Sequence, residues 1–179
     1  MPPVNEMDIQ LLRTFQRLSS VGYSLLRIYE ELGDGHSLEE IVVQITADRF
    51  RLAEGCAKVA QNLLESGIVS EATYRSIISR NYYAIYQAAR AIVFHVTRND
   101  VDDHRRLSDH VGKILGPQWG KVVDRWRKAR NEMDYSPYPE FDEPPLEGLP
   151  LDEVVALSFA EAEGFLDEVR KHLSKRGVK

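Results

Sequence analysis

Helical periodicity runs through almost the whole chain, and this feature most limits the possible fold. Apolar residues recur at intervals of three and four, and no stretch shows the alternation typical of a strand. Amphipathic helices bury their apolar stripes by packing against one another. We therefore expect an all-α protein, a helical bundle of about six helices with an N-terminal helical extension.

Residues that start helices divide the chain. Ser37 and Glu40 have the spacing of a capping box, Ser70 is the expected N-cap of the next helix, and Gly116 with Pro117 precedes another. The expected helices cover about residues 5–32, 37–67, 70–97 and 102–115, a fifth begins after Pro117, and the last covers about 151–173.

The apolar stripes of these helices predict the core. Its expected members are Leu38, Ile41, Ile45, Leu52, Cys56, Val59 and Leu63 in the second helix; Tyr74, Ile77, Asn81, Ala84, Ala88, Ala91 and His95 in the third; Trp119, Val122, Trp126, Ala129 and Met133 in the fifth; and Val154, Ser158, Ala162, Phe165, Val169 and Leu173 in the last. We interpret Cys56 as buried and inert, and His95 as a core residue with its hydrogen bonds satisfied.

The chain divides into an N-terminal extension, residues 1–35, and a bundle, residues 36–179, within one globular domain. The extension either packs on the bundle or serves a partner. Five of the eight prolines lie in segment 136–150, which predicts an extended loop. The loop is acidic and follows the basic fifth helix, so we expect its carboxylates to compete with phosphate for the arginines, as a lid would: Glu140, Asp142, Glu143 and Glu147.

Composition excludes some classes of protein. The longest apolar runs are far shorter than the roughly 20 residues of a membrane span, so we expect no membrane insertion. The first residues lack the pattern of a secretory signal, and a single cysteine excludes an internal disulfide framework. Both observations favour a cytoplasmic protein.

The charge is unevenly distributed. The net charge is −5, yet residues 75–130 hold 12 basic and 5 acidic side chains, a local excess of +7. Attraction to phosphate depends on the local field more than on the net charge. The middle of the chain is therefore suited to a nucleic acid, although solvated helix faces explain the same charges.

Two polar stripes are candidates for binding. On the third helix, Arg80, Tyr83, Gln87 and Arg90 recur at helical spacing, and arginine forks with a tyrosine ring suit phosphate and base contacts. The alternative is a surface stripe in which arginine stems cover the tyrosine.

The fifth helix carries the second stripe. Arg127, Arg130 and Asp134 share one side, with Asn131 beside them and Tyr135 just beyond. The alternative is an ordinary ion pair between Arg130 and Asp134, four residues apart. Two histidines, His104 and His110, point to different sides of their helix, so we expect no metal site and no cofactor.

The two stripes together resemble the HEPN family (higher eukaryotes and prokaryotes nucleotide-binding). Its third-helix pattern S-x-x-YYAxFHAAR is similar to SRNYYAIYQAAR at 79–90, and a later R-N-x-x-x-H or R-x-x-A-DY pattern is similar to RNEMDY at 130–135. The similarity covers about residues 46–174. It implies a HEPN-like bundle and a metal-independent endoribonuclease site shared across a homodimer, which cuts RNA through attack of the ribose 2′-hydroxyl.

The resemblance assigns roles to named residues. It implies that Arg130 stabilises the charge of the phosphorane and that Asn131 orients a phosphate. The family's histidine does not carry over, because position 135 is tyrosine, whose ordinary pKa near 10 makes it a poor base. The hydroxyl of Tyr135 still donates a hydrogen bond or acts as an acid, so binding is expected and catalysis stays open.

We expect an RNA-binding HEPN protein of the toxin or defence type, for which the resemblance implies a nucleotidyltransferase-like antitoxin as partner. The alternative is a non-catalytic helical module that binds a nucleotide or a protein. A third reading is a bundle that only scaffolds an assembly through its first helical region.

Overall fold

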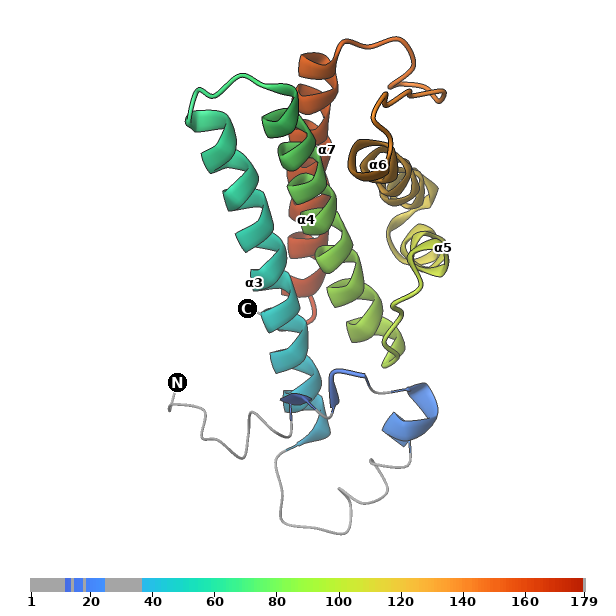
Figure 1. The fold of residues 1–179 in the computed structure, drawn as a ribbon. Coiled ribbons are helices and arrows are strands. Elements are labelled where there is room, and N and C mark those ends of the chain that lie inside the picture. Colours follow the sequence, from blue (N-terminus) through green and yellow to red (C-terminus); the bar gives the residue numbers. More distant parts are fainter. Residues whose placement is uncertain (1–11, 14, 18, 25–36, 179) are drawn as a thin grey trace.

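The protein is a helical bundle. The computed structural model describes residues 12–13, 15–17, 19–24 and 37–178, and these residues contain no strand. The helices are α3 (Leu38–Glu65), α4 (Glu71–Thr97), α5 (His104–Leu115), α6 (Pro117–Tyr135) and α7 (Leu151–Ser174). In Figure 1, α3, α4 and α7 lie side by side along the long axis, while α5 and α6 form a hairpin that runs across α4. The expected all-α bundle is confirmed.

The helix starts follow the local sequence signals. Ser37 and Glu40 make both hydrogen bonds of the capping box at the start of α3. The hydroxyl of Ser70 accepts a hydrogen bond from the backbone N–H of Thr73, 3.1 Å away, at the start of α4. Pro117 is the first residue of α6, where its missing N–H costs no hydrogen bond.

Helix α4 is the centre of the core, because it contacts each of the other four described helices. Its predicted apolar stripe is buried except for Tyr74, which is half-buried. The buried amide of Asn81 donates a 2.8 Å hydrogen bond to the hydroxyl of Ser158 in α7. The predicted core faces of α6 and α7 are also buried, apart from the half-buried Trp119.

The predicted core face of α3 was wrong in its middle. Leu52 and Val59 are 53% and 45% exposed. Helix α3 packs mainly against α4, and small residues, Ala53 and Ala60, occupy the contact and are fully buried. The stripe that contains Ala53 and Ala60 is buried because its small side chains let the two helix backbones approach closely. The stripe that contains Leu52 and Val59 stays exposed although its side chains are larger. Cys56 is only half-buried, and burial raises the pKa of its thiol.

His95 is buried, as predicted, but its hydrogen bonds are not satisfied within the described structure. The side chain is 5% exposed, and Nδ1 has no hydrogen-bond partner among the described residues. Burial, followed by the positive charge of Arg98, lowers its pKa to about 4. The ring therefore stays neutral at pH 7.

The segment 136–150 has no regular secondary structure, as predicted, but it is anchored. Leu146 is 3% exposed and belongs to the core, and Glu143 forms a 2.5 Å ion pair with Lys128 of α6. The loop therefore follows one side of α6.

The described part of the N-terminal extension packs on the bundle. Leu12, Phe15 and Tyr23 contact a small second core that contains Val42 and Phe94. The hydroxyl of Tyr23 donates a 3.1 Å hydrogen bond to Glu39 at the start of α3. Most of the helix predicted for residues 5–32 lies outside the described residues. Among the described helices, none combines the length and the apolar character needed to cross a bilayer.

Candidate functional site

The centre of the candidate site is Arg130, where α6 faces α4. Its Nη2 donates a 2.9 Å hydrogen bond to the hydroxyl of Tyr83, which comes from α4. The guanidinium carbon lies 5.4 Å from the ring centroid of Tyr83 and 5.3 Å from that of Tyr135. Two predicted tyrosines therefore border one predicted arginine, and Tyr135 is 75% exposed. We name Tyr83, Arg130, Asn131, Asp134 and Tyr135 the Arg130 cluster.

The acidic and amide members of the cluster hold the guanidinium from the α6 side. Nε of Arg130 lies 2.6 Å from a carboxylate oxygen of Asp134, and Nη1 donates a 3.2 Å hydrogen bond to the amide oxygen of Asn131. Burial works against the charge, but Asp134 and then Tyr83 raise the pKa of Arg130. The ion pair at four-residue spacing, the alternative weighed for this helix, is therefore present, and the same guanidinium is also bordered by two tyrosines.

Arg127 lies one turn before Arg130 and keeps a free end. Its Nε and Nη2 donate hydrogen bonds of 3.1 and 2.8 Å to the same oxygen of Asp124. Its Nη1 makes no hydrogen bond to another described residue. Arginine Nη atoms carry two N–H groups each, so both Arg127 and Arg130 have donors left for a phosphate.

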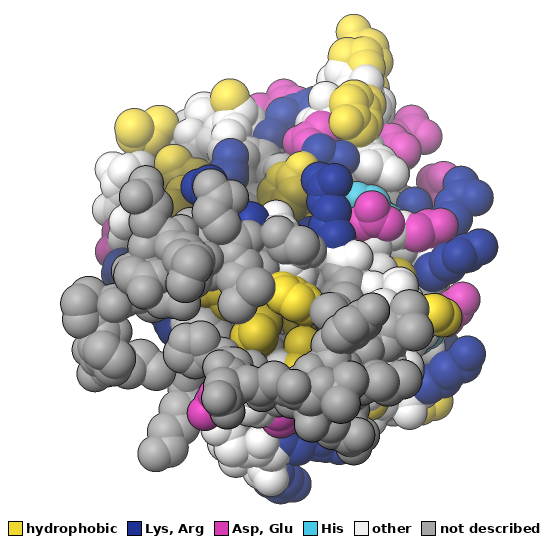
Figure 2. Space-filling model, turned by 90° about the horizontal axis from the view of Figure 1, so that it is seen from below, with side chains coloured by type: hydrophobic (Ala, Val, Ile, Leu, Met, Phe, Trp, Pro, Cys, Tyr) yellow, Lys and Arg dark blue, Asp and Glu magenta, His cyan; other side chains and the backbone are white. Residues whose placement is uncertain are grey.

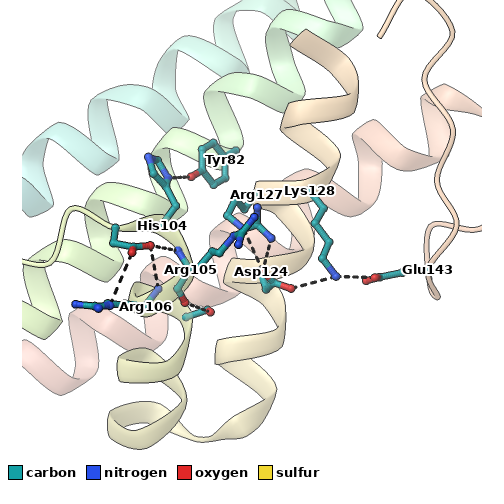
Figure 3. A network of polar contacts seen from close by, with 10 residues as sticks. Tyr82, His104, Arg105, Arg106, Asp124, Arg127, Lys128 and Glu143 are labelled. Atoms are coloured by element: carbon teal, nitrogen blue, oxygen red, sulfur yellow. Dashed lines mark hydrogen bonds and ion pairs between the residues drawn. The ribbon is translucent and has the colours of Figure 1, made fainter. Parts of the chain in front are cut away.

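A histidine from α5 joins this face. Nδ1 of His104 is hydrogen-bonded to the hydroxyl of Tyr82, and its ring stacks on that of Tyr86, with centroids 4.3 Å apart and an interplanar angle of 11°. Figure 3 shows His104 and Tyr82 meeting between α5 and α4, near Arg127 and Asp124 of α6. We name Tyr82, Tyr86, His104 and Arg127 the His104 cluster.

The two clusters are continuous. The rings of Tyr82 and Tyr83 lie 5.4 Å apart, so contacts run from His104 through the two tyrosines to Arg130. Burial, and then the charges of Arg130 and Arg127, lower the pKa of His104. Burial also raises the pKa of Tyr82, whose hydroxyl therefore stays protonated at neutral pH.

The predicted Arg90 lies beside the His104 cluster, with its guanidinium carbon 5.6 Å from the ring centroid of Tyr86, but it is paired with a buried acidic residue. Arg90 makes hydrogen bonds of 2.6 to 3.2 Å to both oxygens of Asp100, which also pairs with Arg49 of α3 at 3.0 Å. Asp100 is only 8% exposed, so this is an internal ion network. Nε and Nη2 of Arg90 are thereby committed to this network, which joins α3 to the connection after α4, while its Nη1 makes no hydrogen bond to another described residue.

The remaining two predicted residues stand beside the clusters without contacts to them. Arg80 is exposed and Gln87 is half-buried, and neither makes a hydrogen bond or ion pair with another described residue. Both lie on α4, within one turn of Tyr83, and remain available to a ligand.

The acidic loop does not cover the arginines in this structure. Its one ion pair among the described residues joins Glu143 to Lys128, at a position on α6 that carries neither cluster. No ion pair between described residues links the loop to Arg127 or Arg130. The expected lid over the arginines is therefore absent from this arrangement.

Sequence reasoning missed Tyr82 and His104 as members of the site. Tyr82 was not predicted because it lies outside the polar stripe of its helix. His104 was considered only as a metal ligand, and it has no second ligand on the same side of its helix. The connection 98–103 runs back along α4, where the backbone oxygen of Asp102 accepts a 3.3 Å hydrogen bond from Tyr86. No periodicity predicts that path.

The α5 and α6 side of the molecule carries the site's electrostatic surroundings. Figure 2 shows Lys and Arg side chains along the right-hand edge of the view, the side on which Figure 1 places α5 and α6, with acidic side chains among them. Arg105 and Arg106 follow His104 directly and are exposed. The part of the chain that the structure describes holds no group of three metal-ligating side chains. The chain matches no family model, no curated protein and no solved structure.

Proposed function

We propose that this is a HEPN-type RNA-binding protein of the toxin or defence type, which binds RNA on the face formed by α4, α5 and α6. One observation carries the proposal: the guanidinium carbon of Arg130 lies 5.4 and 5.3 Å from the ring centroids of Tyr83 and Tyr135, and the group still has an unused N–H donor. Arginine offers forked donors to a phosphate, and an exposed tyrosine ring offers a surface on which a base stacks.

The surroundings support RNA over a neutral ligand. Arg127 adds a second guanidinium with a free end, and Arg105 and Arg106 directly follow His104 and are exposed. The acidic loop is drawn to Lys128, so its carboxylates leave the arginines uncovered. A phosphodiester backbone therefore meets several cations at once, which strengthens binding at low salt.

The wider proposal follows the resemblance in sequence. It comprises a symmetric homodimer with the motif helix near the axis, a cytoplasmic location, a nucleotidyltransferase-like antitoxin as partner, and metal-independent cleavage of RNA. Tyr135 is the weak point for cleavage, because it stands where the family has a histidine and a phenol is a poor general base.

A second function is favoured by one observation. Asp134, Asn131 and Tyr83 all engage the guanidinium of Arg130, as they would in a residue that only braces α6 against α4. In that case the protein is a non-catalytic module that binds a nucleotide or a protein, and the tyrosines are structural.

Substitution of Arg130 separates these functions. Arg130→Ala is compared with Arg170→Ala, because Arg170 also pairs with carboxylates and lies 5.5 Å from an aromatic ring, that of Phe50, but belongs to α7. Binding of a labelled single-stranded RNA is followed by fluorescence anisotropy at two salt concentrations. We expect Arg130→Ala to weaken binding about tenfold and to reduce its salt dependence, with the control unchanged.

Thermal unfolding completes the comparison. We expect the midpoint of Arg130→Ala to stay within a few degrees of the wild type, since ion pairs near the surface contribute little. A protein that unfolds on this change assigns Arg130 a bracing role and supports the second function. Equal losses of RNA binding in the two variants mean that only net charge matters, and the proposed face is then wrong.

A further inference from the structure

His104 has the surroundings of a functional histidine rather than of a core histidine. It is the first residue of α5, it is exposed, and its Nδ1 is held by the hydroxyl of Tyr82. One face of its ring is covered by Tyr86. The ring is therefore fixed on one side and at one nitrogen, while Nε2 makes no hydrogen bond to another described residue.

The phenol suits both protonation states of the imidazole. In the neutral tautomer with a proton on Nδ1, this N–H donates to the oxygen of Tyr82 and leaves a lone pair on Nε2. In the imidazolium, Nδ1–H still donates to the same oxygen. The hydrogen bond thus persists while Nε2 gains and loses a proton.

The charges around the ring favour its neutral form. Arg130 and Arg127 of α6 and Arg90 of α4 all lower the pKa of His104, after burial, while Asp103 beside it raises the pKa. At pH 7 the ring is therefore ready to accept a proton. Two of these arginines, Arg127 and Arg130, also attract a phosphate, and a bound phosphate would relieve part of this repulsion.

We propose that His104 is the general base of an RNA-cleaving site, with Nε2 accepting the proton of a ribose 2′-hydroxyl next to a phosphate bound by Arg127 and Arg130. This inference rests on the proposed function, because it needs RNA on the same face. In this proposal His104 of α5 supplies the general base, because position 135, where the family has a histidine, is a tyrosine in this chain.

The reaction balances with groups that are present. The 2′-hydroxyl proton moves to Nε2 of His104, O2′ forms a bond to phosphorus, and the bond from phosphorus to O5′ breaks. The leaving O5′ takes a proton from water, and Arg127 and Arg130 stabilise the added negative charge on phosphorus oxygens. The products are a 2′,3′-cyclic phosphate and a 5′-hydroxyl end, and His104 returns its proton to solvent.

The test uses the full chain, EDTA and a labelled single-stranded RNA. Wild type, His104→Gln and His110→Gln are compared, because His110 lies on the same helix and outside both clusters. Anisotropy measures binding, gel analysis measures cleavage, and an RNA with one 2′-deoxy position shows whether the 2′-hydroxyl is needed. Thermal midpoints show that the variants are folded.

We expect His104→Gln to bind RNA as the wild type does and to lose cleavage by about a hundredfold or more, with His110→Gln unchanged. The wild-type rate should rise with pH along a limb set by one group with a pKa below 6.5, and His104→Gln should lack that limb. Cleavage should stop at the 2′-deoxy position and leave a cyclic phosphate.

The outcomes separate the two proposals. RNA binding by the wild type without cleavage at any pH overturns the role of His104 and leaves the RNA-binding function standing. Cleavage by His104→Gln at the wild-type rate has the same consequence. Absence of RNA binding by the folded wild type overturns the proposed function and, with it, this inference.

Discussion

Arg130 and Arg90 show how the same residue type serves different ends in one chain. Nε and Nη2 of Arg90 donate hydrogen bonds to the two carboxylate oxygens of the buried Asp100. Arg130 contacts an amide, two phenols and one carboxylate oxygen, which leaves at least one of its five N–H donors. Availability for a ligand therefore depends on the partners of an arginine, which helical spacing alone does not distinguish.

His95 gives a prediction at this scale. Its pKa of about 4 in the folded protein lies below the ordinary 6.5, because of burial and Arg98; Arg176 and His172 act in the same direction and Glu39 opposes them. Between pH 6.5 and 4, His95 therefore binds a proton in the unfolded chain but not in the folded protein. Stability is fully present above this window and falls as the pH drops, by about 2 kcal/mol between pH 7 and 5.

Urea unfolding at pH 7 and pH 5 measures this dependence. His95→Leu, which removes the titrating ring, should lose most of the difference between the two pH values, whereas His110→Leu should keep it. An unchanged difference in His95→Leu would mean that another group, such as His172, dominates the acid sensitivity.

At the scale of elements, the α5 and α6 hairpin positions both clusters, since it supplies His104, Arg127 and Arg130. The two helices approach each other closely at Gly112 and Gly120. A Cβ atom built on Gly120 lies 2.8 Å from the backbone oxygen of Ser108 and 3.1 Å from Cα of Gly112. Backbone atoms do not yield as a flexible side chain would, so glycine is required at this position.

We predict that Gly120→Ala lowers the free energy of unfolding by about 1–3 kcal/mol, because the helices must separate. The matched control is Gly55→Ala in the middle of α3, where an added Cβ meets nothing within 4 Å. This control should raise the free energy of unfolding by about 0.5–1 kcal/mol, the helix preference of alanine over glycine. Urea unfolding checks both, and a stabilised Gly120→Ala would refute the close packing.

At the scale of the whole molecule, α4 lies between α3 and α7 on one side and the α5 and α6 hairpin on the other. The core of large side chains, with Trp126 and Phe165 fully buried, leaves the end of α6 at the surface. One chain presents one Arg130, and a two-fold dimer about this end would bring two such sites together.

We predict that the protein is a dimer whose contact includes the end of α6. Light scattering at micromolar concentration should give twice the 20.5 kDa of one chain. Tyr135→Glu should shift the protein toward monomer, because it places a charge on an exposed aromatic side chain at that end. Val69→Glu, which changes an equally exposed residue before α4, should leave the mass unchanged. A monomeric wild type would contradict the dimer.

The amino-acid sequence was enough to predict the described helices and most of the core. Capping residues act on their own backbone, so Ser37 and Ser70 start helices wherever these pack. The apolar faces of α4, α6 and α7 were equally predictable, because each helix has one strong stripe and burial follows it. The prediction failed for Leu52 of α3, which is exposed, because that helix has two apolar stripes and only one of them can pack against α4.

Which polar side chains contact one another depends on how the helices pack, and this could not be predicted from local sequence. Helical spacing predicts one stripe of four polar residues: Arg80, Tyr83, Gln87 and Arg90. In the structure, however, Arg90 forms an ion pair with Asp100, and the hydroxyl of Tyr83 accepts a hydrogen bond from Arg130. His104 reaches Tyr82 because the connection after α4 runs back along that helix. Contacts of this kind depend on the path of a loop and the crossing of helices, and those are set by the packing of the whole core rather than by any stretch of sequence.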